Sequence, residues 1–432
     1  MERTHTLAVG RRSCVSVDIK RKIEEANEEF LKRVTSGDPV LVDVAPAGDV
    51  YPDFSGKTIL HAGPPVEWKR MSGAQRGACI GISLFEGWAA DADEATRLLE
   101  EGTIRLEPNH HHRMVGPMAG TITPSMWVWV VENKTFGNRA SCRQVESRQQ
   151  FGQYSSEALS GLETWRDVWA PALQTAVRSM DGLPLKPIIT KALQMGDELH
   201  NRPVAASSLF ANAMSIPLLK SGLPQQQIAA TLGYLGGHEL LFLGLSMAAA
   251  KSIADPARDI PFCTGVTAMA RNGTEFGIQV SGLDSEWFTA PAPEVKGLFL
   301  PGYSEGDEGR DIGDSAITET VGWGGFVLGG AAGILSFVGG TPDEAMAYSR
   351  QMRRITIGQS PDYLIPALGF EGTAVGIDIR KVVKTGVLPI IDTAMAHKEP
   401  GHPIVGAGLV RPPMECFKKA VKRFAEKYAV EH

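Results

Sequence analysis

The chain has 432 residues, 43% of them hydrophobic, and a formal net charge of -6 at pH 7. This length exceeds one ordinary hydrophobic core, so two or three globular domains are expected. Because the basic residues are interspersed with acidic ones, the sequence has no positive field for nucleic acid.

The five cysteines are odd in number, widely separated and free of C-x-x-C spacing. This pattern favours reduced thiols over disulfides or a zinc ribbon. Residues 1–12 carry charges and no apolar signal core, so we expect a cytoplasmic protein without a secretory signal.

Residues 1–124 predict an α/β domain. Apolar side chains recur at helical spacing over residues 19–34, and Gly37-Asp38-Pro39 ends that helix. Buried strands are predicted at 39–43, 58–61 and 103–106, with helices at 77–89 and 93–101. Their alternation indicates a parallel sheet. No G-x-G-x-x-G motif follows any of these strands, so the sequence does not indicate a nucleotide cofactor.

The rest of the chain predicts two further domains. Residues 125–255 begin with an aromatic strand at 125–132 and are then mainly helical. Residues 256–432 predict a glycine-rich α+β domain, with strands at 264–269, 276–280 and 297–300 and helices near 343–355 and 413–428. The uncharged run 321–340 contains eight glycines, which favours a buried helix or a glycine-kinked strand pair over a membrane span.

A polar junction precedes that apolar run. Asp314 or Ser315 is placed to cap a helix whose first N–H groups would attract a phosphate or carboxylate. Glu319, one turn further, has to be paired, hydrated or protonated if it is buried. The alternative is a capped core helix with Glu319 at its solvated end.

Three adjacent histidines, His110, His111 and His112, follow a predicted strand, where α/β folds place ligands. Adjacent side chains cannot all face one point, so three metal ligands from this triplet are poor geometry. We expect one of them to act on substrate, with a structural hydrogen-bonding role or metal ligation as alternatives.

The densest polar cluster spans residues 195–202. If it is helical, Asp197, His200 and Asn201 share one face, and Glu198 and Arg202 form a second pair. A solvated helical face is the alternative, but the apolar residues on both sides favour a site lining.

Arg271 precedes the turn signal Asn272-Gly273. Turn chemistry alone accounts for the Asn-Gly pair, whereas the guanidinium fork of Arg271 suits a carboxylate or phosphate.

Seven ordered motifs resemble the YahG/YlbE-like family, a bacterial family long catalogued as a domain of unknown function. They span most of the chain: LHAGPP at 60–65, FEGWA at 85–89, VGPMAG at 115–120, MGDELHNR at 195–202, MARNG at 269–273, GDSAITET at 313–320 and GAG at 406–408.

The resemblance implies a Rossmann-like N-terminal domain, a small helical domain and α+β domains. One family member is a subunit of oxamate carbamoyltransferase, in which oxalurate and phosphate give oxamate and carbamoyl phosphate, and it acts with FdrA-type and YlbF-type partner subunits. This chain departs from the family at residues 146–154, which are shorter and different, and at Ile404, where a glutamine is expected.

Phosphorolysis of a ureido acid needs cations for phosphate and carboxylate, a polarised carbonyl and a proton for the departing nitrogen. We assign the anions to Arg271 and Arg202, with further substrate contacts from Asn201, Asn272, Asp314 and Ser315. A histidine of the triplet or His200 is the candidate for polarisation or protonation, and Glu198 and Glu319 for orienting that base or binding a cation.

Two other functions stay open. A metal-assisted hydrolase of cyclic amides or ureides would use the triplet with Glu198, Asp197 or Glu319, and a divalent metal, if present, would bind His111, Asp197 and Glu198. A non-catalytic scaffold subunit is the other alternative. A homo-oligomer, a small anionic substrate and no membrane or nucleic-acid partner are expected.

Overall fold

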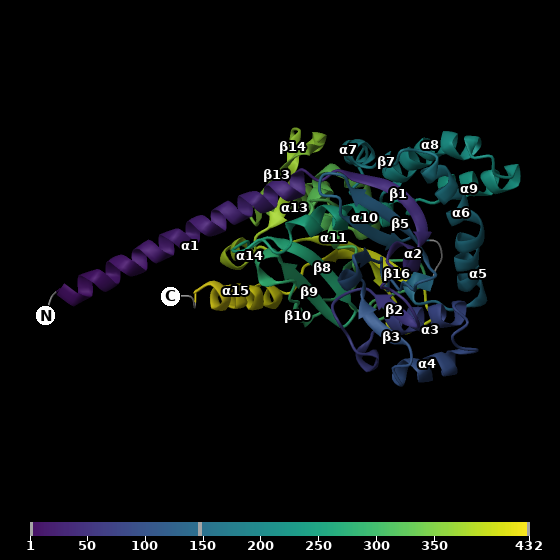
Figure 1. Ribbon diagram of the computed structural model, residues 1–432, viewed down its shortest axis with the longest axis horizontal. Helices are drawn as coiled ribbons and strands as arrows, with labels where there is room; N and C mark the ends of the chain where they lie inside the picture. The colour runs from purple at the N-terminus through teal and green to yellow at the C-terminus, as the bar shows by residue number, and fades with distance from the viewer. Residues whose placement is uncertain (1–2, 146–148, 430–432) are drawn as a thin grey trace.

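The computed structural model describes residues 3–145 and 149–429 of the chain. Within these residues the fold is a mixed α/β arrangement with five sheets. Figure 1 shows α1 (Arg3–Thr35) running away from the body, and α15 (Met414–Ala429) ending on the same side of the molecule.

The largest sheet has five strands in the order β4-β6-β5-β1-β7. Its neighbours pair antiparallel except for β4 and β6, which are parallel. The strands are β1 (Pro39–Pro46), β4 (Met114–Val115), β5 (Trp127–Asn133), β6 (Arg139–Arg143) and β7 (Leu183–Pro184).

The predicted parallel N-terminal sheet is therefore wrong in part. Strands β2 (Thr58–His61) and β3 (Arg105–Pro108) do pair in parallel, with Thr58 opposite Arg105. Strand β1 instead pairs with β5, the aromatic strand, in antiparallel register. Periodicity in the sequence identifies a strand but does not predict which other strand it pairs with.

Helices dominate residues 156–254, as predicted. Helix α10 is buried along its whole length and contacts β5 and β6, so it fills the core under the large sheet. The helices from the start of the chain to this point are α2 (Ala47–Val50), α3 (Gly73–Phe85), α4 (Ala92–Glu100), α5 (Ser156–Thr164), α6 (Ala170–Arg178), α7 (Lys186–Gln194), α8 (Val204–Lys220), α9 (Gln225–Gly237) and α10 (Leu241–Ala254).

The predicted strands of the C-terminal third are present. They form a four-stranded sheet in the order β10-β9-β8-β12, a three-stranded sheet in the order β11-β16-β15, and the hairpin β13-β14. The strands are β8 (Val266–Asn272), β9 (Glu275–Val280), β10 (Phe288–Pro291), β11 (Lys296–Phe299), β12 (Ile312–Gly313), β13 (Thr356–Ile365), β14 (Glu371–Ile377), β15 (Ile391–Ala396) and β16 (Ile404–Val410).

The apolar run 321–340 is neither a long helix nor a strand pair. It folds into the 3₁₀ segments Gly324–Gly330 and Ala332–Ile334 and the one-turn α12 (Leu335–Val338). Its glycines interrupt any regular element, and Gly324–Gly330 packs against α13 (Pro342–Met352) while α12 packs against β11 and β16. The remaining helices are α11 (Ile317–Thr320) and α14 (Ile379–Thr385).

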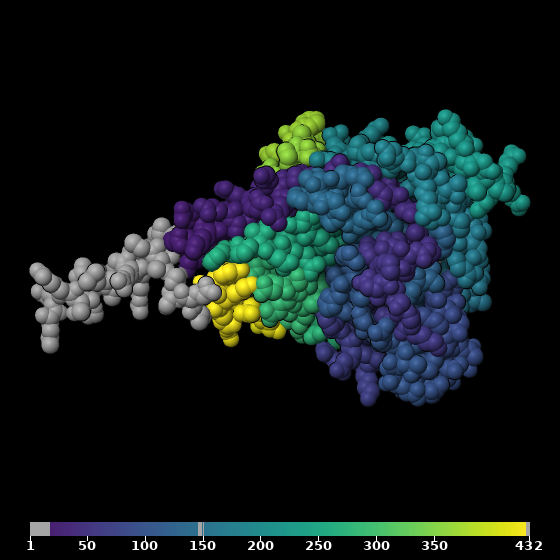
Figure 2. Space-filling view, in the orientation of Figure 1, coloured from purple at the N-terminus to yellow at the C-terminus, as the bar shows by residue number. Residues whose placement is uncertain are grey.

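Helix α1 packs against the middle and the C-terminal third of the chain. Ile23, Ala26, Phe30 and Val34, all on the predicted stripe, are buried, and the helix contacts α10, β13 and β14. Figure 2 shows this part of α1 lying against residues of the C-terminal half.

The large sheet crosses the predicted boundary at residue 124, because β1 and β5 belong to it. One hydrophobic cluster also includes Phe30, Trp129 and Ile365, from all three predicted domains. The three-domain division thus remains a prediction. No single helix in the described ranges is long and apolar enough to cross a membrane, and α9 reaches that length only together with residues 241–257, across a 77° bend.

Candidate functional site

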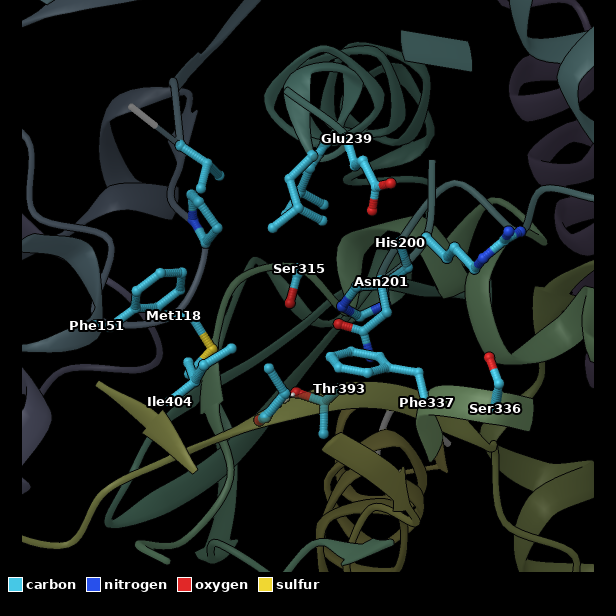
Figure 3. Close-up of a pocket in the computed structure, with 16 residues that line it drawn as sticks. Met118, Phe151, His200, Asn201, Glu239, Ser315, Ser336, Phe337, Thr393 and Ile404 are labelled. Carbon is cyan, nitrogen blue, oxygen red and sulfur yellow. Dashed lines mark hydrogen bonds between the residues drawn. The ribbon is translucent and has the colours of Figure 1, made fainter. Parts of the chain in front are cut away.

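A cavity of about 330 Å³ opens between segments that are distant in sequence. Figure 3 shows His200 and Asn201 across the cavity from Met118 and Phe151, with Thr393 and Phe337 closing another side. The lining residues are Pro117, Met118, Val145, Phe151, His200, Asn201, Arg202, Glu239, Leu240, Leu243, Ser315, Ser336, Phe337, Thr393, Ala394 and Ile404. The volume lies at the lower end of the range for small-molecule sites.

The cluster at 195–202 is a loop and not the predicted helix. It connects α7 to α8, and Leu199 has a φ of 71°, outside the helical region. The carboxylate of Glu198 accepts hydrogen bonds from the backbone N–H groups of His200 (2.6 Å) and Arg202. Glu198 therefore holds in place the part of the loop that presents His200, Asn201 and Arg202 to the cavity.

Asp197 has a capping function. Its oxygens accept the backbone N–H groups of Ala205 (3.0 Å) and Ala206 (2.7 Å), in the first turn of α8. Both oxygens are thus engaged, and the predicted metal set of His111, Asp197 and Glu198 does not form a cluster among the described residues.

His200 and Glu319 meet directly in the interior. His200 Nδ1 lies 2.9 Å from Glu319 Oε1, and both side chains are at most 2% exposed. Glu319 also accepts the Thr318 hydroxyl (2.9 Å) and the Gly325 N–H (3.0 Å). Glu319 is therefore not at a solvated helix end, which corrects that alternative.

Carboxylates set the protonation of His200. Burial by itself would lower the pKa of His200, but the negative charges of Glu319 and Asp392 together outweigh it, so the pKa lies above its usual value. Gly324 makes this arrangement possible, because its φ is +59° and a Cβ there would lie 2.1 Å from Glu319 Oε1.

Asp392 completes the buried cluster, and sequence reasoning did not single it out. Its Oδ1 lies 3.8 Å from His200 Nδ1. Burial raises the pKa of Asp392 to about 6. Glu198 is also buried, and its burial together with the Asp392 charge raises the pKa of Glu198 well above its usual value. The signal in the sequence was a single acid within the apolar stretch of β15.

Arg271, which we expected to bind an external anion, is paired inside the protein instead. It is fully buried, and its fork pairs with Asp311 through Nε (2.7 Å) and Nη2 (3.0 Å). Its other N–H groups bond to Gly313 O (2.8 Å), Thr393 Oγ1 (2.9 Å) and Ser315 Oγ (3.3 Å). Because all five N–H groups have partners, Arg271 fastens β8, β12 and β15 together beneath the cavity.

Asn272 is also structural. Its amide donates to Pro64 O (3.0 Å), and its oxygen accepts the N–H groups of Thr274 and Glu275. The predicted substrate contact of Asn272 is thus replaced by turn chemistry, the alternative that the Asn-Gly pair had offered.

Asp314 does not cap a helix. Its oxygens accept the Gly63 N–H (2.8 Å), the Asn109 amide (2.8 Å) and the Gly116 N–H (2.9 Å). Burial, only partly offset by these bonds, raises the pKa of Asp314 to about 6. The helix that follows, α11, spans only Ile317–Thr320 and has no side-chain cap, so neither Asp314 nor Ser315 caps it as predicted. Ser315 does line the cavity.

The three histidines diverge, as expected from their adjacency. His110 is buried 3.6 Å from Asp314, and burial holds its pKa well below the usual value. His111 accepts the indole N–H of Trp287 (3.1 Å), and His112 pairs with Glu107 at the surface (2.5 Å). None of the three lines the cavity, so the structure gives them no contact with a ligand bound there.

Arg202 is the one Lys or Arg among the described residues that line the cavity. Its guanidinium lies against Gly333 and has neither an ion pair nor a hydrogen bond within the described residues. Beside it, the buried amide nitrogen of Asn201 has no hydrogen-bond partner. Two donors are thus available to an anionic ligand.

Both departures from the family pattern lie at or near this cavity. Phe151, from the segment 146–154, and Ile404 line it, whereas residues 146–148 lie outside the described ranges. Glu239, which sequence reasoning missed, lines the opposite wall from Phe337 in Figure 3.

Comparisons with known proteins agree with one another. Residues 104–315 match the family described as oxamate carbamoyltransferase subunit AllG. The Escherichia coli (strain K12) protein YahG, described as uncharacterized, is 43% identical over 412 residues, covering 95% of this chain and 87% of YahG. Oxamate carbamoyltransferase subunit AllG of the same strain is 41% identical over 414 residues, covering 94% of this chain and 99% of AllG.

A crystal structure of a conserved protein of unknown function from Enterococcus faecalis V583 has the same fold. The two chains superpose with a TM-score of 0.92 at 41% identity, covering 94% of this chain and 99% of the other. The resemblance inferred from the seven motifs is confirmed.

Proposed function

The chain belongs to the family of the oxamate carbamoyltransferase subunit AllG, and we propose that it is a subunit of a carbamoyltransferase acting on a small carboxylate-bearing ureide. The reaction we assign is that of oxalurate with phosphate to give oxamate and carbamoyl phosphate. The bond between the carbamoyl carbon and the oxamate nitrogen breaks, a bond from that carbon to a phosphate oxygen forms, and the nitrogen gains a proton.

The observation that carries this proposal is the unpaired guanidinium of Arg202 in the wall of the cavity. A planar guanidinium binds a carboxylate through two parallel hydrogen bonds. The unpartnered amide of Asn201 adds a donor beside it. The oxamate half of the substrate has a carboxylate and an adjacent carbonyl oxygen, which fits these two groups.

His200 is the candidate for polarising the ureido group. Its Nδ1 is held by Glu319 at 2.9 Å, which leaves Nε2 for a ligand in the cavity that His200 lines. An Nε2–H aimed at the ureido carbonyl stabilises the negative charge that develops there during attack. Glu198 and Glu319 then act as positioning residues, through the loop and the ring respectively.

Glu239 provides an acceptor on another wall of the same cavity. The carbamoyl group ends in an NH₂, and a carboxylate is a suitable partner for it. A ligand with a carboxylate at one end and an amide at the other would therefore bind in one orientation, from Arg202 to Glu239.

The shortage of cations supports the role of a subunit. The reaction binds a substrate carboxylate and a phosphate dianion, whereas Arg202 is the one Lys or Arg among the described lining residues. We assign the remaining phosphate-binding groups to partner subunits of the FdrA and YlbF types. The scaffold alternative differs from this assignment in giving Arg202 no contact with substrate.

The test is steady-state kinetics of the chain co-expressed with those partners. Arg202→Ala should lower kcat/KM for oxalurate at least tenfold, and Arg202→Lys should fall between it and the wild type, because the charge remains and the fork is lost. Arg97→Ala is the matched control, since Arg97 is exposed and pairs with Glu94 and Glu101 on its own helix. An Arg202→Ala complex as active as the Arg97→Ala complex would exclude this site and leave the scaffold function.

A further inference from the structure

The cluster behind the cavity has more acid than its surroundings neutralise. Glu198, Glu319 and Asp392 are all 0% exposed, and the imidazole of His200 lies among them. The positive charge of Arg271, which acts on His200, is already matched by Asp311 in a bidentate pair. Three buried carboxyl groups therefore share one imidazole, and uncompensated buried charge is strongly unfavourable.

Asp392 is the sharpest sign of a missing partner. Neither of its oxygens accepts a hydrogen bond from another described residue. Its neighbour Glu198, whose pKa is raised well above its usual value by burial and by the Asp392 charge, can share a proton with it but brings no positive charge. A buried carboxylate in this position needs either a shared proton or a cation.

The ligand atoms of three residues already lie close together. His200 Nδ1, one oxygen of Glu319 and one of Asp392 are all within 4.8 Å of one another. The pair distances from Nδ1 are 2.9 Å to Glu319 and 3.8 Å to Asp392. Donor atoms about 2.0–2.2 Å from one ion are separated by about 3 Å, so small adjustments would bring these three into one coordination sphere.

We propose that His200, Glu319 and Asp392 bind a divalent first-row metal ion, with Asp392 Oδ1, Glu319 Oε1 and His200 Nδ1 as its ligands. One imidazole and two carboxylates suit Zn²⁺, Mn²⁺ or Co²⁺ better than Mg²⁺ or Ca²⁺, which prefer oxygen alone. The two carboxylate charges cancel those of the ion. Coordination through Nδ1 leaves Nε2–H of His200 directed at the cavity.

The surroundings of the cluster fit this site. Thr318 donates to the second oxygen of Glu319 (2.9 Å), so the first oxygen is oriented toward His200. The backbone of Gly324 and Gly325 covers one side without a side chain, because a Cβ at Gly324 would strike Glu319. On the other side His200 and Thr393 line the cavity, which gives an ion a route in.

This proposal is independent of the carbamoyl reaction, so its test uses no activity. The untagged chain is treated with a chelator, and Mn²⁺ binding is measured by electron paramagnetic resonance and Zn²⁺ binding by calorimetry. We expect about one ion per chain and a metal-dependent rise in the thermal midpoint. A wild-type chain that binds neither ion would overturn the proposal.

Two variants separate a metal from a shared proton. Asp392→Asn should weaken metal binding at least tenfold and abolish the metal-dependent rise in the thermal midpoint. Glu319→Gln, which keeps the shape of the side chain and removes its charge, should do the same. Asp43→Asn, a partly exposed carboxylate paired with Arg178, is the matched control and should bind metal as the wild type does. If Asp392→Asn stabilises the chain while metal binding is the same in both proteins, the cluster holds a proton and not a metal.

Discussion

Replacing Arg271 by lysine should destabilise the fold beneath the cavity. The guanidinium makes five hydrogen bonds, to Asp311 twice and to Gly313, Ser315 and Thr393. A lysine keeps the charge, but its three donors cannot reproduce a planar fork. At least two hydrogen bonds are therefore lost. A neutral hydrogen bond contributes about 1 kcal/mol to stability and a charged one about 1.5–3 kcal/mol, so the free energy of unfolding should fall by about 2–4 kcal/mol.

The assay is thermal unfolding of the wild type and of Arg271→Lys, with the exposed Arg97→Lys as control. For a chain of this size the predicted loss lowers the thermal midpoint by roughly several degrees, whereas the surface change should be within about 0.5 kcal/mol of zero.

The origin of the loss can be checked with a double variant. Arg271→Met alone leaves the Asp311 charge buried and unpaired, which costs about 3–5 kcal/mol, and Arg271→Met combined with Asp311→Leu should recover much of that. If Arg271→Lys and Arg97→Lys melt alike, the structural role of Arg271 is refuted.

Three other predictions follow from single contacts. Gly324→Ala should cost at least about 1–2 kcal/mol because of its left-handed φ, and should also lower turnover by displacing Glu319, so unchanged melting and turnover would contradict the close approach. The pKa of Asp314 is about 6 in the folded state against an ordinary 3.8, so folding favours the protonated carboxyl. The contribution of Asp314 to the free energy of unfolding is therefore complete below pH 3.8 and is lost as the pH rises through 6. Asp314→Asn should remove this slope from the midpoint measured against pH, and a persisting slope would assign it to another group. Asp197→Ala should cost about 1–2 kcal/mol through the lost cap of α8, and a wild-type midpoint would show that the cap is dispensable.

Local patterns predicted elements well and their partners poorly. The stripe of α1, the aromatic strand β5 and the strands β8 and β9 are present because each depends on its own periodicity. The pairing of β1 with β5 depends on which edge is free in three dimensions, and periodicity carries no such information.

The site shows the same division. His200 and Glu319 were candidates because polar groups beside apolar runs stand out in a sequence, and the structure brings them to 2.9 Å. Asp392 escaped notice because a single acid in a buried strand forms no motif. Arg271 was misassigned because a sequence shows a cation and not the internal acid, Asp311, that matches it.

The loop at 195–202 shows why a helical pattern was not enough. Gly196 has a φ of +95° and Leu199 one of 71°, and both stop the helix that the spacing suggests. Glu198 then bonds to the N–H groups that a helix would have used internally. The polar residues of this loop still reach the interior, but through a turn geometry that the spacing did not predict.

The most direct test of the proposed function follows the ureido carbon of oxalurate. The substrate is labelled with ¹³C at that carbon and given to the chain co-expressed with its partner subunits, and the product is identified by NMR with and without phosphate. We expect phosphate-dependent transfer of the label to carbamoyl phosphate, with release of oxamate. Label that appears as carbonate without phosphate would indicate a hydrolase, and unchanged oxalurate in both samples would contradict the assignment of the substrate.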